Sequence, residues 1–526
     1  MLGEMWSFKG RYKVLHMTWF AFFLSFVVWF NLPPLATTIK AEFDLGPGQM
    51  GTLAMCNVAL TVPARVIIGM LLDKYGPRLT YSVLLVYAAI PCLIFATAQD
   101  FNQLVVGRLL MGIVGAGFVI GIRMTAEWFP PKEIGLAEGI YGGWGNFGSA
   151  FSALTMVIVA GALSFFPGAV EVASGGALNW RAAIALTGIV AAVYGVIYYG
   201  GVRDTPPGKV YQKPKSARGL EVTSVKDFYL LLAMNAPLAI ILMVLAWRLQ
   251  KVKFLTPTTM TIAWGACIAL YLFQAYNAYT VNKDLLTGKK RYSAEDRYKF
   301  KQVAILELTY IVNFGSELAV VSMLPAFFEG TFGISKALAG FLGASYAFVN
   351  LIARPGGGLI SDKLGSRKRT MGILTFCMGI GYLVMSMIPS LNVGGSGAIV
   401  LAVIMTMCCS FFVQAGEGST YAIVPLIKRR VTGQIAGNVG AYGNVGAVAY
   451  LTIFSLLPEW LGAAGKDVAP EILNQRNIIF FQVLGVAALV VAFLCFFILE
   501  EPKGSFAEAH EGESTSSESS IPSATL

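Results

Sequence analysis

The sequence predicts an all-α polytopic membrane protein, for three reasons. Hydrophobic residues make up 56% of the 526-residue chain and charged residues 13%, about half the charge of a typical soluble domain. Twelve or more apolar segments lie between Trp19 and Leu499, each near the roughly 20 residues that cross a bilayer core. Lys and Arg concentrate in alternate loops, as in the cytoplasmic loops of membrane proteins. The composition therefore excludes a water-soluble protein with a large core.

The net charge of +10 does not indicate a nucleic-acid partner, because the basic residues belong to these alternate loops. All seven cysteines lie in apolar segments without CxxC spacing, which predicts buried thiols and no disulfide framework or metal site. The only histidines, His16 and His510, stand at the margins of the chain. We therefore expect no cofactor, no metal and no enzymatic activity.

The expected spans form two sets of six around a central insert. The first set comprises 16–38, 49–72, 79–98, 102–128, 134–165 and 180–201, and the second comprises 303–329, 336–361, 370–389, 397–425, 432–458 and 476–499. The N-terminus lacks a signal-peptide cleavage site, so the first apolar stretch is expected to be a true span.

The insert, residues 203–302, contains two further apolar stretches at 228–247 and 257–281. Both of its flanks are rich in Lys and Arg and are expected in the cytoplasm, so an even number of spans should lie between them. Two extra helices give fourteen in all. Arg248, Lys251 and Lys253 would then face outside, against the rule, and an interfacial hairpin is the alternative.

The tail at 503–526 is polar, acidic and rich in serine, and it is expected to be disordered. A phosphorylated regulatory tail and a plain solvated tail are both compatible with this composition. With an even number of spans, both termini should lie in the cytoplasm of a multi-pass plasma-membrane protein.

Two motifs repeat in the same order in both halves of the chain. RVIIGMLLDKYGPR at 65–78 matches RPGGGLISDKLGSR at 354–367, a separation of 289 residues (354 − 65). GIYGGWGNFG at 139–148 matches GNVGAYGNVG at 437–446, a separation of 298 residues (437 − 139). We therefore expect two six-helix bundles, 1–202 and 303–502. Repeats of this kind are typical of transporters whose substrate binds near the bilayer midplane.

Arg65 and Arg354 occupy equivalent and deep positions in this repeat. Asp73 and Asp362 mark the cytoplasmic boundary, and each arginine lies eight residues earlier, about 12 Å deeper at ~1.5 Å per residue. A central arginine costs about 2.5–3.5 kcal/mol to insert, so two in register need a joint reason. An anion between two guanidinium groups is one such reason, and a structural salt bridge for each arginine is the other.

The pattern G-x-x-x-D-K/R-x-G-x-R after the second and eighth helices resembles the hallmark of the major facilitator superfamily. With the arginine four residues earlier, and with GGWGNFG and GAYGNVG, the chain resembles the nitrate/nitrite porter family. QAGEGSTYAIVPLIKRRVTGQIAGNVGAYGNVG at 414–446 is particularly similar to cyanobacterial nitrate permeases. The resemblance covers the core but not the insert or tail. It implies alternating access, nitrate or nitrite between Arg65 and Arg354, and gating loops that contain Asp73, Arg78, Asp362 and Arg367.

The same resemblance implies further substrate contacts. Asn146 would hydrogen-bond the anion, with its repeat mate Asn444 as a second candidate. Tyr310 and Phe314 form an i, i+4 pair on one helix face, and Phe118 would supply the opposing ring of an aromatic sandwich. Without the resemblance, rings and glycines in such positions are usually packing residues.

Glu317 and Glu417 lie within the seventh and tenth helices of the core. An intramembrane carboxylate is a proton-relay candidate, because burial favours its protonated form. A structural hydrogen bond or an arginine partner is the alternative. Arg123 and Glu127, at i and i+4, are expected to form a local ion pair.

The sequence thus predicts a monomeric carrier in the lipid bilayer that imports nitrate or nitrite. The membrane potential opposes anion entry by about 2.3 kcal/mol per charge per 100 mV, so import needs a second ion. Proton symport is the first hypothesis, and nitrate/nitrite exchange is the second. A membrane nitrate sensor, or an exporter of organic anions or drugs from the same superfamily, are further alternatives.

Overall fold

This computed structural model describes residues 6–171, 176–214, 218–294, 296–391, 395–462 and 469–502. The predicted tail at 503–526 lies wholly outside them. The described chain is helical apart from turns, loops and a short hairpin, in which β1 (Val170–Glu171) pairs antiparallel with β2 (Ala177–Leu178). The all-α polytopic fold class is confirmed.

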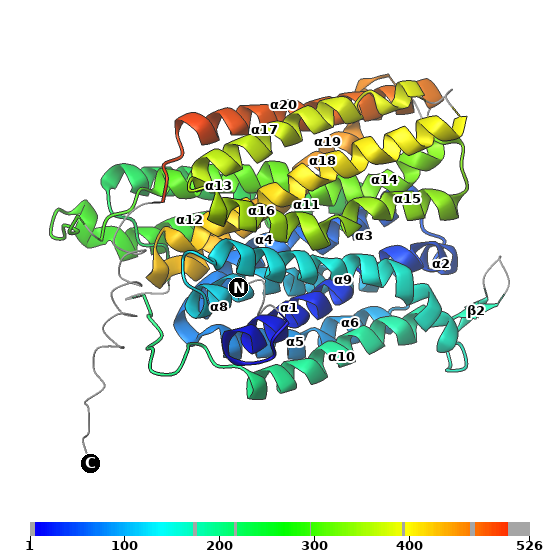
Figure 1. The fold of residues 1–526 in the computed structure, drawn as a ribbon. Helices are drawn as coiled ribbons and strands as arrows, with labels where there is room; N and C mark the ends of the chain where they lie inside the picture. The colour runs from blue at the N-terminus through cyan, green and yellow to red at the C-terminus, as the bar shows by residue number, and fades with distance from the viewer. Residues whose placement is uncertain are drawn as a thin grey trace, which may run out of the picture.

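The helices form two stacked groups in Figure 1, with the blue-to-cyan first half below and the green-to-red second half above. Several spans of the first half are broken near their middle by single residues or short 3₁₀ turns. Its elements are α1 (Gly10–Trp29), α2 (Ala36–Glu42), α3 (Pro47–Ala59), α4 (Thr61–Tyr75), α5 (Pro77–Tyr87), α6 (Ala89–Ala96), α7 (Phe101–Gly112), η3 (Ile113–Ala116), α8 (Gly117–Trp128), α9 (Ile134–Ala162) and α10 (Trp180–Gly201).

The second half repeats this plan after the two helices of the insert. The insert contributes α11 (Val225–Lys251) and α12 (Pro257–Leu286). The second half consists of α13 (Phe300–Tyr310), the π-helical turn η4 (Ile311–Gly315), α14 (Ser316–Phe332), α15 (Lys336–Phe348), α16 (Asn350–Lys363), α17 (Arg367–Met385), α18 (Gly395–Ile423), η7 (Arg429–Val431), α19 (Thr432–Trp460) and α20 (Pro470–Phe497).

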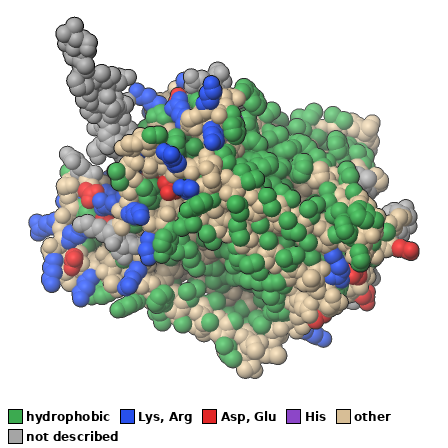
Figure 2. Space-filling model, turned by 90° about the horizontal axis from the view of Figure 1, so that it is seen from below, with side chains coloured by type: hydrophobic (Ala, Val, Ile, Leu, Met, Phe, Trp, Pro, Cys, Tyr) green, Lys and Arg blue, Asp and Glu red, His purple; other side chains and the backbone are tan. Residues whose placement is uncertain are grey.

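Within the described residues, 13 helical segments are long and apolar enough to cross a membrane, α11 and α12 among them. The pair α15–α16 is not in this group, although it occupies the place of the eighth core span. Its α16 carries Arg354 and Asp362 together with one proline and three glycines, which lowers its hydropathy. Figure 2 shows hydrophobic side chains across the middle of the molecule and Lys and Arg gathered at its left. We call the end that holds the loops after α4 and α16 the basic end.

The two halves meet along glycine-lined faces near the basic end. A Cβ added to Gly69 of α4 would lie 2.5 Å from the carbonyl oxygen of Gly433 on α19, and one on Gly358 of α16 would overlap the carbonyl of Gly135 on α9. Small residues allow membrane helices to approach this closely, which increases their van der Waals contact. The repeated glycines therefore bring α4 against α19 and α16 against α9.

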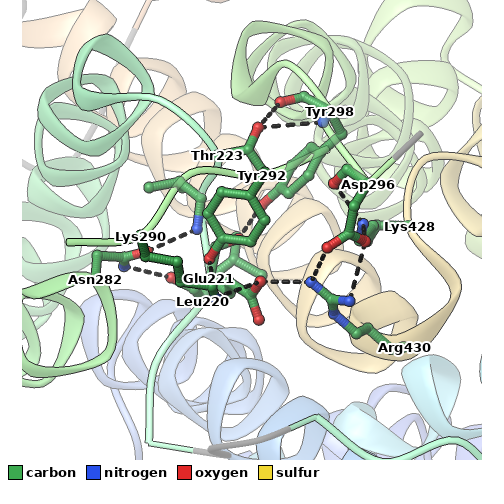
Figure 3. A network of polar contacts seen from close by, with 11 residues as sticks. Leu220, Glu221, Thr223, Asn282, Lys290, Tyr292, Asp296, Tyr298, Lys428 and Arg430 are labelled. Atoms are coloured by element: carbon green, nitrogen blue, oxygen red, sulfur yellow. Dashed lines mark hydrogen bonds and ion pairs between the residues drawn. The ribbon is translucent and has the colours of Figure 1, made fainter. Parts of the chain in front are cut away.

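The insert is tied to the second half by an ion-pair network at the basic end (Figure 3). Arg430 donates to Glu221 at 2.5 Å and to Asp296 at 3.0 Å, and Lys428 also donates to Asp296. Burial acts to raise the pKa of Asp296, but the hydrogen bonds from Lys428 and Arg430 outweigh it and leave the pKa below its ordinary value. Its contribution to stability is therefore complete above the ordinary pKa and is lost as the pH falls through the lowered one.

The close approach of the halves can be tested by substituting two glycines of α16, Gly358 and Gly356. Gly358→Ala should lower the thermal unfolding midpoint in detergent, because overpacking typically costs about 1–3 kcal/mol. Gly356 is the matched control, since a Cβ there meets nothing within 4 Å, and Gly356→Ala should leave the midpoint unchanged or raise it slightly. Equal midpoints for the two variants would contradict the glycine-lined interface.

Candidate functional site

Arg65 lies on α4, fully buried between the two halves. Its Nη1 donates to the carbonyl of Gly440 on α19 at 2.6 Å, while Nε and Nη2 donate to the carbonyl of Gly115 at 3.3 and 3.2 Å. Among the described residues, no ion pair involves Arg65. Its positive charge is therefore met only by neutral oxygens and by aromatic rings.

Arg354 occupies the equivalent place on α16 and has a different environment. It forms an ion pair with Glu417 of α18, and its Nη2 donates to the Tyr310 hydroxyl at 3.2 Å. The sequence leaves open a proton relay, a structural hydrogen bond or an arginine partner for Glu417, and the structure contains the arginine partner. The two repeat arginines thus occupy equivalent positions, but only Arg354 has a carboxylate partner among the described residues.

Each repeat arginine is packed against a glycine of the opposite half. The side chain of Arg65 passes Gly440, where an added Cβ would lie 3.2 Å from its Cδ. An added Cβ on Gly142 of α9 would overlap Nε of Arg354. Gly142 and Gly440 are repeat mates, so the glycine motif of each half makes room for the arginine of the other.

One aromatic ring brings the two arginines together. The Phe118 ring centroid lies 5.4 Å from Cζ of Arg65 and 5.0 Å from Cζ of Arg354. Phe118 is almost parallel to Tyr310, at 6.1 Å between centroids and 5° between planes, and Tyr310 is stacked on Phe314 at 5.0 Å. Phe118 therefore lies beside both guanidinium groups, while Phe314 contacts Arg65 at 5.1 Å and Tyr310 contacts Arg354.

The π-helical turn η4 explains how Tyr310 and Phe314 stack. Tyr310 directly precedes the segment Ile311–Gly315 and Phe314 lies within it; such π-helical turns insert an extra residue and are frequent at functional sites. Behind them, a Cβ on Gly443 would lie 2.7 Å from both rings. The absence of a side chain at this glycine allows α19 to pack directly against the aromatic pair.

Two further tyrosines complete the aromatic cluster and were missed by the sequence analysis. Tyr421 packs edge-on against Phe118 at 4.7 Å and against Tyr310 at 5.0 Å, while Tyr141 is stacked on Phe118 at 6.0 Å. Both lie inside the motifs that carry the family resemblance. Their place within these motifs offered a signal, but nothing in the sequence shows which way each ring points.

Asn146 is buried on α9, one turn after Gly142, and neither atom of its amide group has a hydrogen-bond partner. Its repeat mate Asn444 donates weakly to Gly440 at 3.3 Å, and its Oδ1 has no partner. Unsatisfied buried amides cost about 1–3 kcal/mol, so both positions are suited to a polar ligand. Asn146 has more unused hydrogen-bonding capacity, because both of its amide atoms lack a partner and only Oδ1 of Asn444 does.

Glu317 lies on α14 directly after η4. Its Oε1 accepts a hydrogen bond from Asn350 at 2.7 Å, while its Oε2 has no partner. It interacts electrostatically with both Glu417 and Arg354. Of these two carboxylates, only Glu417 forms an ion pair with Arg354 among the described residues. Two other buried glutamates, Glu138 and Glu307, were not singled out by the sequence analysis.

The halves are locked together at the basic end by a symmetric pair of carboxylates. Asp73 of α4 accepts the backbone N–H groups of Gly433 and Gln434, both at 2.9 Å, where α19 begins. Asp362 of α16 accepts those of Gly135 and Leu136 at 3.1 and 2.8 Å, where α9 begins. A carboxylate at a helix N-terminus satisfies unpaired donors and complements the helix dipole.

The arginines of the two repeat loops are placed differently. Arg367 pairs with Asp362 at 2.7 Å. Arg78 instead binds the end of α10 and the segment that follows it. Its Nε donates to the carbonyl of Tyr199 at 2.7 Å, and its backbone N–H donates to the carboxylate of Asp204 at 2.8 Å. The arginine that pairs with Asp73 is Arg123, whose Nε lies 3.9 Å from Oδ1 of Asp73.

Arg123 also forms the local ion pair expected with Glu127, at 3.1 Å. The structure adds a partner from the other half, since Arg429 donates to Glu127 at 2.9 Å and Arg123 donates to the carbonyl of Arg429. The insert joins this group through Tyr211, whose hydroxyl accepts from Nε of Arg123 at 3.2 Å. The Arg123–Glu127 ion pair therefore belongs to the contacts that hold the two halves together at the basic end.

Residues 18–287 and 306–523 match the family model of the Major Facilitator Superfamily. The chain is 70% identical to the nitrate/nitrite transporter NrtP of Picosynechococcus sp., over 98% of this chain and 97% of that protein. It is 56% identical to the nitrate/nitrite transporter NrtP of Nostoc punctiforme, over 99% of each.

Among solved structures, the proton:xylose symporter XylE bound to 6-bromo-6-deoxy-D-glucose shares the fold, with a TM-score of 0.60 at 15% identity over 95% of this chain and 98% of that one. The chain belongs to the Major Facilitator Superfamily and, within it, to the family of the cyanobacterial nitrate/nitrite transporters.

Proposed function

We propose that this protein imports nitrate and nitrite by alternating access, with protons as the coupling ion. The observation that carries the proposal is the approach of two buried arginines, Arg65 and Arg354, to the same aromatic ring, Phe118. Relatives at 70% and 56% identity bear the name of nitrate/nitrite transporters. The charge and shape of the site suit the same anions.

A planar monovalent oxyanion fits the chemistry of this site. Guanidinium groups present paired N–H donors in one plane, which match the oxygens of nitrate or nitrite. Parallel rings such as Tyr310 and Phe118 limit the space above and below a flat ligand. The unpaired amide of Asn146 can donate to a further oxygen. Bulkier tetrahedral or organic anions would have to displace the stacked rings.

The basic end is proposed to face the cytoplasm, in accordance with the positive-inside rule. The Asp73 and Asp362 contacts with α19 and α9 then close the cytoplasmic side. Import requires these contacts to break while the halves rock around the anion. Since each carboxylate and its arginine lie eight residues apart on α4 or α16, movement of the gate also moves the binding groups.

Proton coupling is proposed to run through Glu417 and Glu317. An ionised Glu417 occupies Arg354 and competes with the substrate anion for it. A proton on Glu417 releases Arg354 for nitrate, and Glu317 beside it supplies a second carboxylate for a proton. At least two protons per anion give net inward positive charge, so the membrane potential then favours uptake.

The forked guanidinium groups can be tested by conservative substitution. Arg65→Lys and Arg354→Lys should each weaken nitrate transport in proteoliposomes by about tenfold to a hundredfold in apparent affinity, because charge-assisted hydrogen bonds of about 1.5–3 kcal/mol are lost. Arg369→Lys, at an exposed position on α17, is the control. Wild-type affinity in both site variants would refute the paired-donor site.

The carboxylate pair can be tested by its response to a pH gradient. An inward proton gradient should accelerate nitrate uptake by the wild type, and Glu417→Gln should abolish this acceleration because Gln carries no titratable proton. Glu329→Gln, near the end of α14, should leave it intact. Flux that ignores the proton gradient and requires an anion on both sides of the membrane would instead establish exchange.

A further inference from the structure

Among the described residues, four arginines are fully buried: Arg65, Arg108, Arg123 and Arg354. Arg123 and Arg354 pair with buried carboxylates. Arg108, like Arg65, takes part in no ion pair among the described residues. Arg108 therefore shares the electrostatic signature of the proposed substrate arginine, although neither repeat motif contains it.

The polar contacts of Arg108 are all with neutral groups and leave part of its side chain unsatisfied. Nη2 donates to the carbonyl of Trp29 at 2.9 Å, and Nη1 contacts Oδ1 of Asn31 at 3.2 Å and the sulfur of Met111 at 3.4 Å. Its Nε has no hydrogen-bond partner, and the residue is only 1% exposed. A buried cation without a counter-charge is costly, because neutral acceptors replace only part of its hydration.

Arg108 lines a cavity of about 250 Å³ on the seam between the halves. Asn57 and Phe30 belong to the wall from the first half, and Leu318, Ser322 and Leu451 belong to the wall from the second half. A space of this size holds a four-atom anion with several waters. Because both halves line it, its shape must change when they rock.

The cavity lies one layer of side chains beyond the Arg65 site, on the side away from the basic end. Arg108 precedes Gly115, the carbonyl partner of Arg65, by seven residues along α7 and η3, a rise of about 10 Å. Trp29 separates the two. Its carbonyl accepts from Arg108, and its ring lies 5.9 Å from Cζ of Arg65. An anion beside Arg108 would be one step from the aromatic cluster.

A purely structural role explains only part of this geometry. Arg108 satisfies the carbonyl of Trp29 at the C-terminal end of α1, where helices lack intrahelical donors. Asn57 already donates to the same carbonyl at 2.9 Å. Capping therefore accounts for neither the free Nε nor the placement of a full charge on a cavity shared by both halves.

We propose that Arg108 forms a second binding station for a monovalent oxyanion of the nitrate type, between the Trp29 layer and the end opposite the basic end. The proposal rests on the proposed function and extends it to the entry route. An anion held there loses part of its hydration, and a water retained with it can donate to Oδ1 of Asn57, which has no partner. A positive station raises the local anion concentration and the rate of capture.

The station can be isolated by removing the inner site. Purified Arg65→Gln/Arg354→Gln protein should still bind nitrate saturably in calorimetry, and adding Arg108→Gln should abolish that binding. Arg181→Gln in the same background is the control, because Arg181 binds carbonyls and Glu42 at the same end outside the cavity. Thermal unfolding midpoints establish that each variant is folded.

The outcomes separate this proposal from the proposed function. Two outcomes would overturn the station but not the proposed function. In the first, the wild type binds nitrate and the Arg65→Gln/Arg354→Gln variant does not. In the second, binding by that variant persists after Arg108→Gln is added. A wild type that binds no nitrate would overturn both. Chloride binding as tight as nitrate binding in the double variant would overturn the oxyanion assignment.

Transport kinetics supply a second readout in the otherwise unaltered protein. Arg108→Gln should raise the KM for nitrate uptake by about tenfold with little change in the maximal rate, because capture depends on the station and the inner step does not. Arg108→Lys, which retains the charge, should restore most of the affinity. A fall in maximal rate at unchanged KM in both variants would indicate a structural role and overturn the station.

Discussion

The structure depends on one exchange between its halves: each half places its arginine against the glycine face of the other. Gly440 of the second half borders Arg65, and Gly142 of the first half borders Arg354. A side chain at either glycine would push the guanidinium away from the aromatic cluster or separate the helices. The binding groups and the interface between the halves are therefore built from the same contacts.

This exchange also couples the site to the closure at the basic end. Asp73 and Asp362 follow the two arginines on the same helices and bind the starts of α19 and α9, which carry the bordering glycines. A rigid helix transmits a displacement at one point to the other, two turns away. The proposed gating and the proposed anion binding therefore involve the same two helix pairs, α4 with α19 and α16 with α9. The insert adds Tyr211, Glu221 and Asp296 to the same end.

Much of this arrangement could be predicted from the sequence, because repeats report on symmetry. Constant separations placed Arg65 and Arg354 at one depth and assigned two related bundles, and the apolar stretches of the insert predicted α11 and α12. The sequence offers an arginine partner as one alternative for Glu417 but does not identify it as Arg354, since Arg65, the repeat mate of Arg354, has no such partner. Electrostatic differences between repeat mates depend on the rotation of each helix, which the sequence does not specify to within one side chain.

The same limit applies to Tyr141, Tyr421 and Arg108. Their depth follows from their place along a helix, but whether they face the seam, the lipid or a neighbouring helix depends on packing between segments far apart in the chain. Phe118 and Tyr310 were assigned through family resemblance, and periodicity alone would have left them as core residues. The central bends at η3 and η4, which orient these rings, carry no clear sequence signal.

The account is tested most directly by an experimental structure of the wild-type protein with nitrate at saturating concentration. It predicts density for a planar anion beside Phe118 within hydrogen-bond distance of both Arg65 and Arg354, with the Arg354–Glu417 contact lengthened or lost. An unchanged Arg354–Glu417 pair, with anion density away from both arginines, would contradict it.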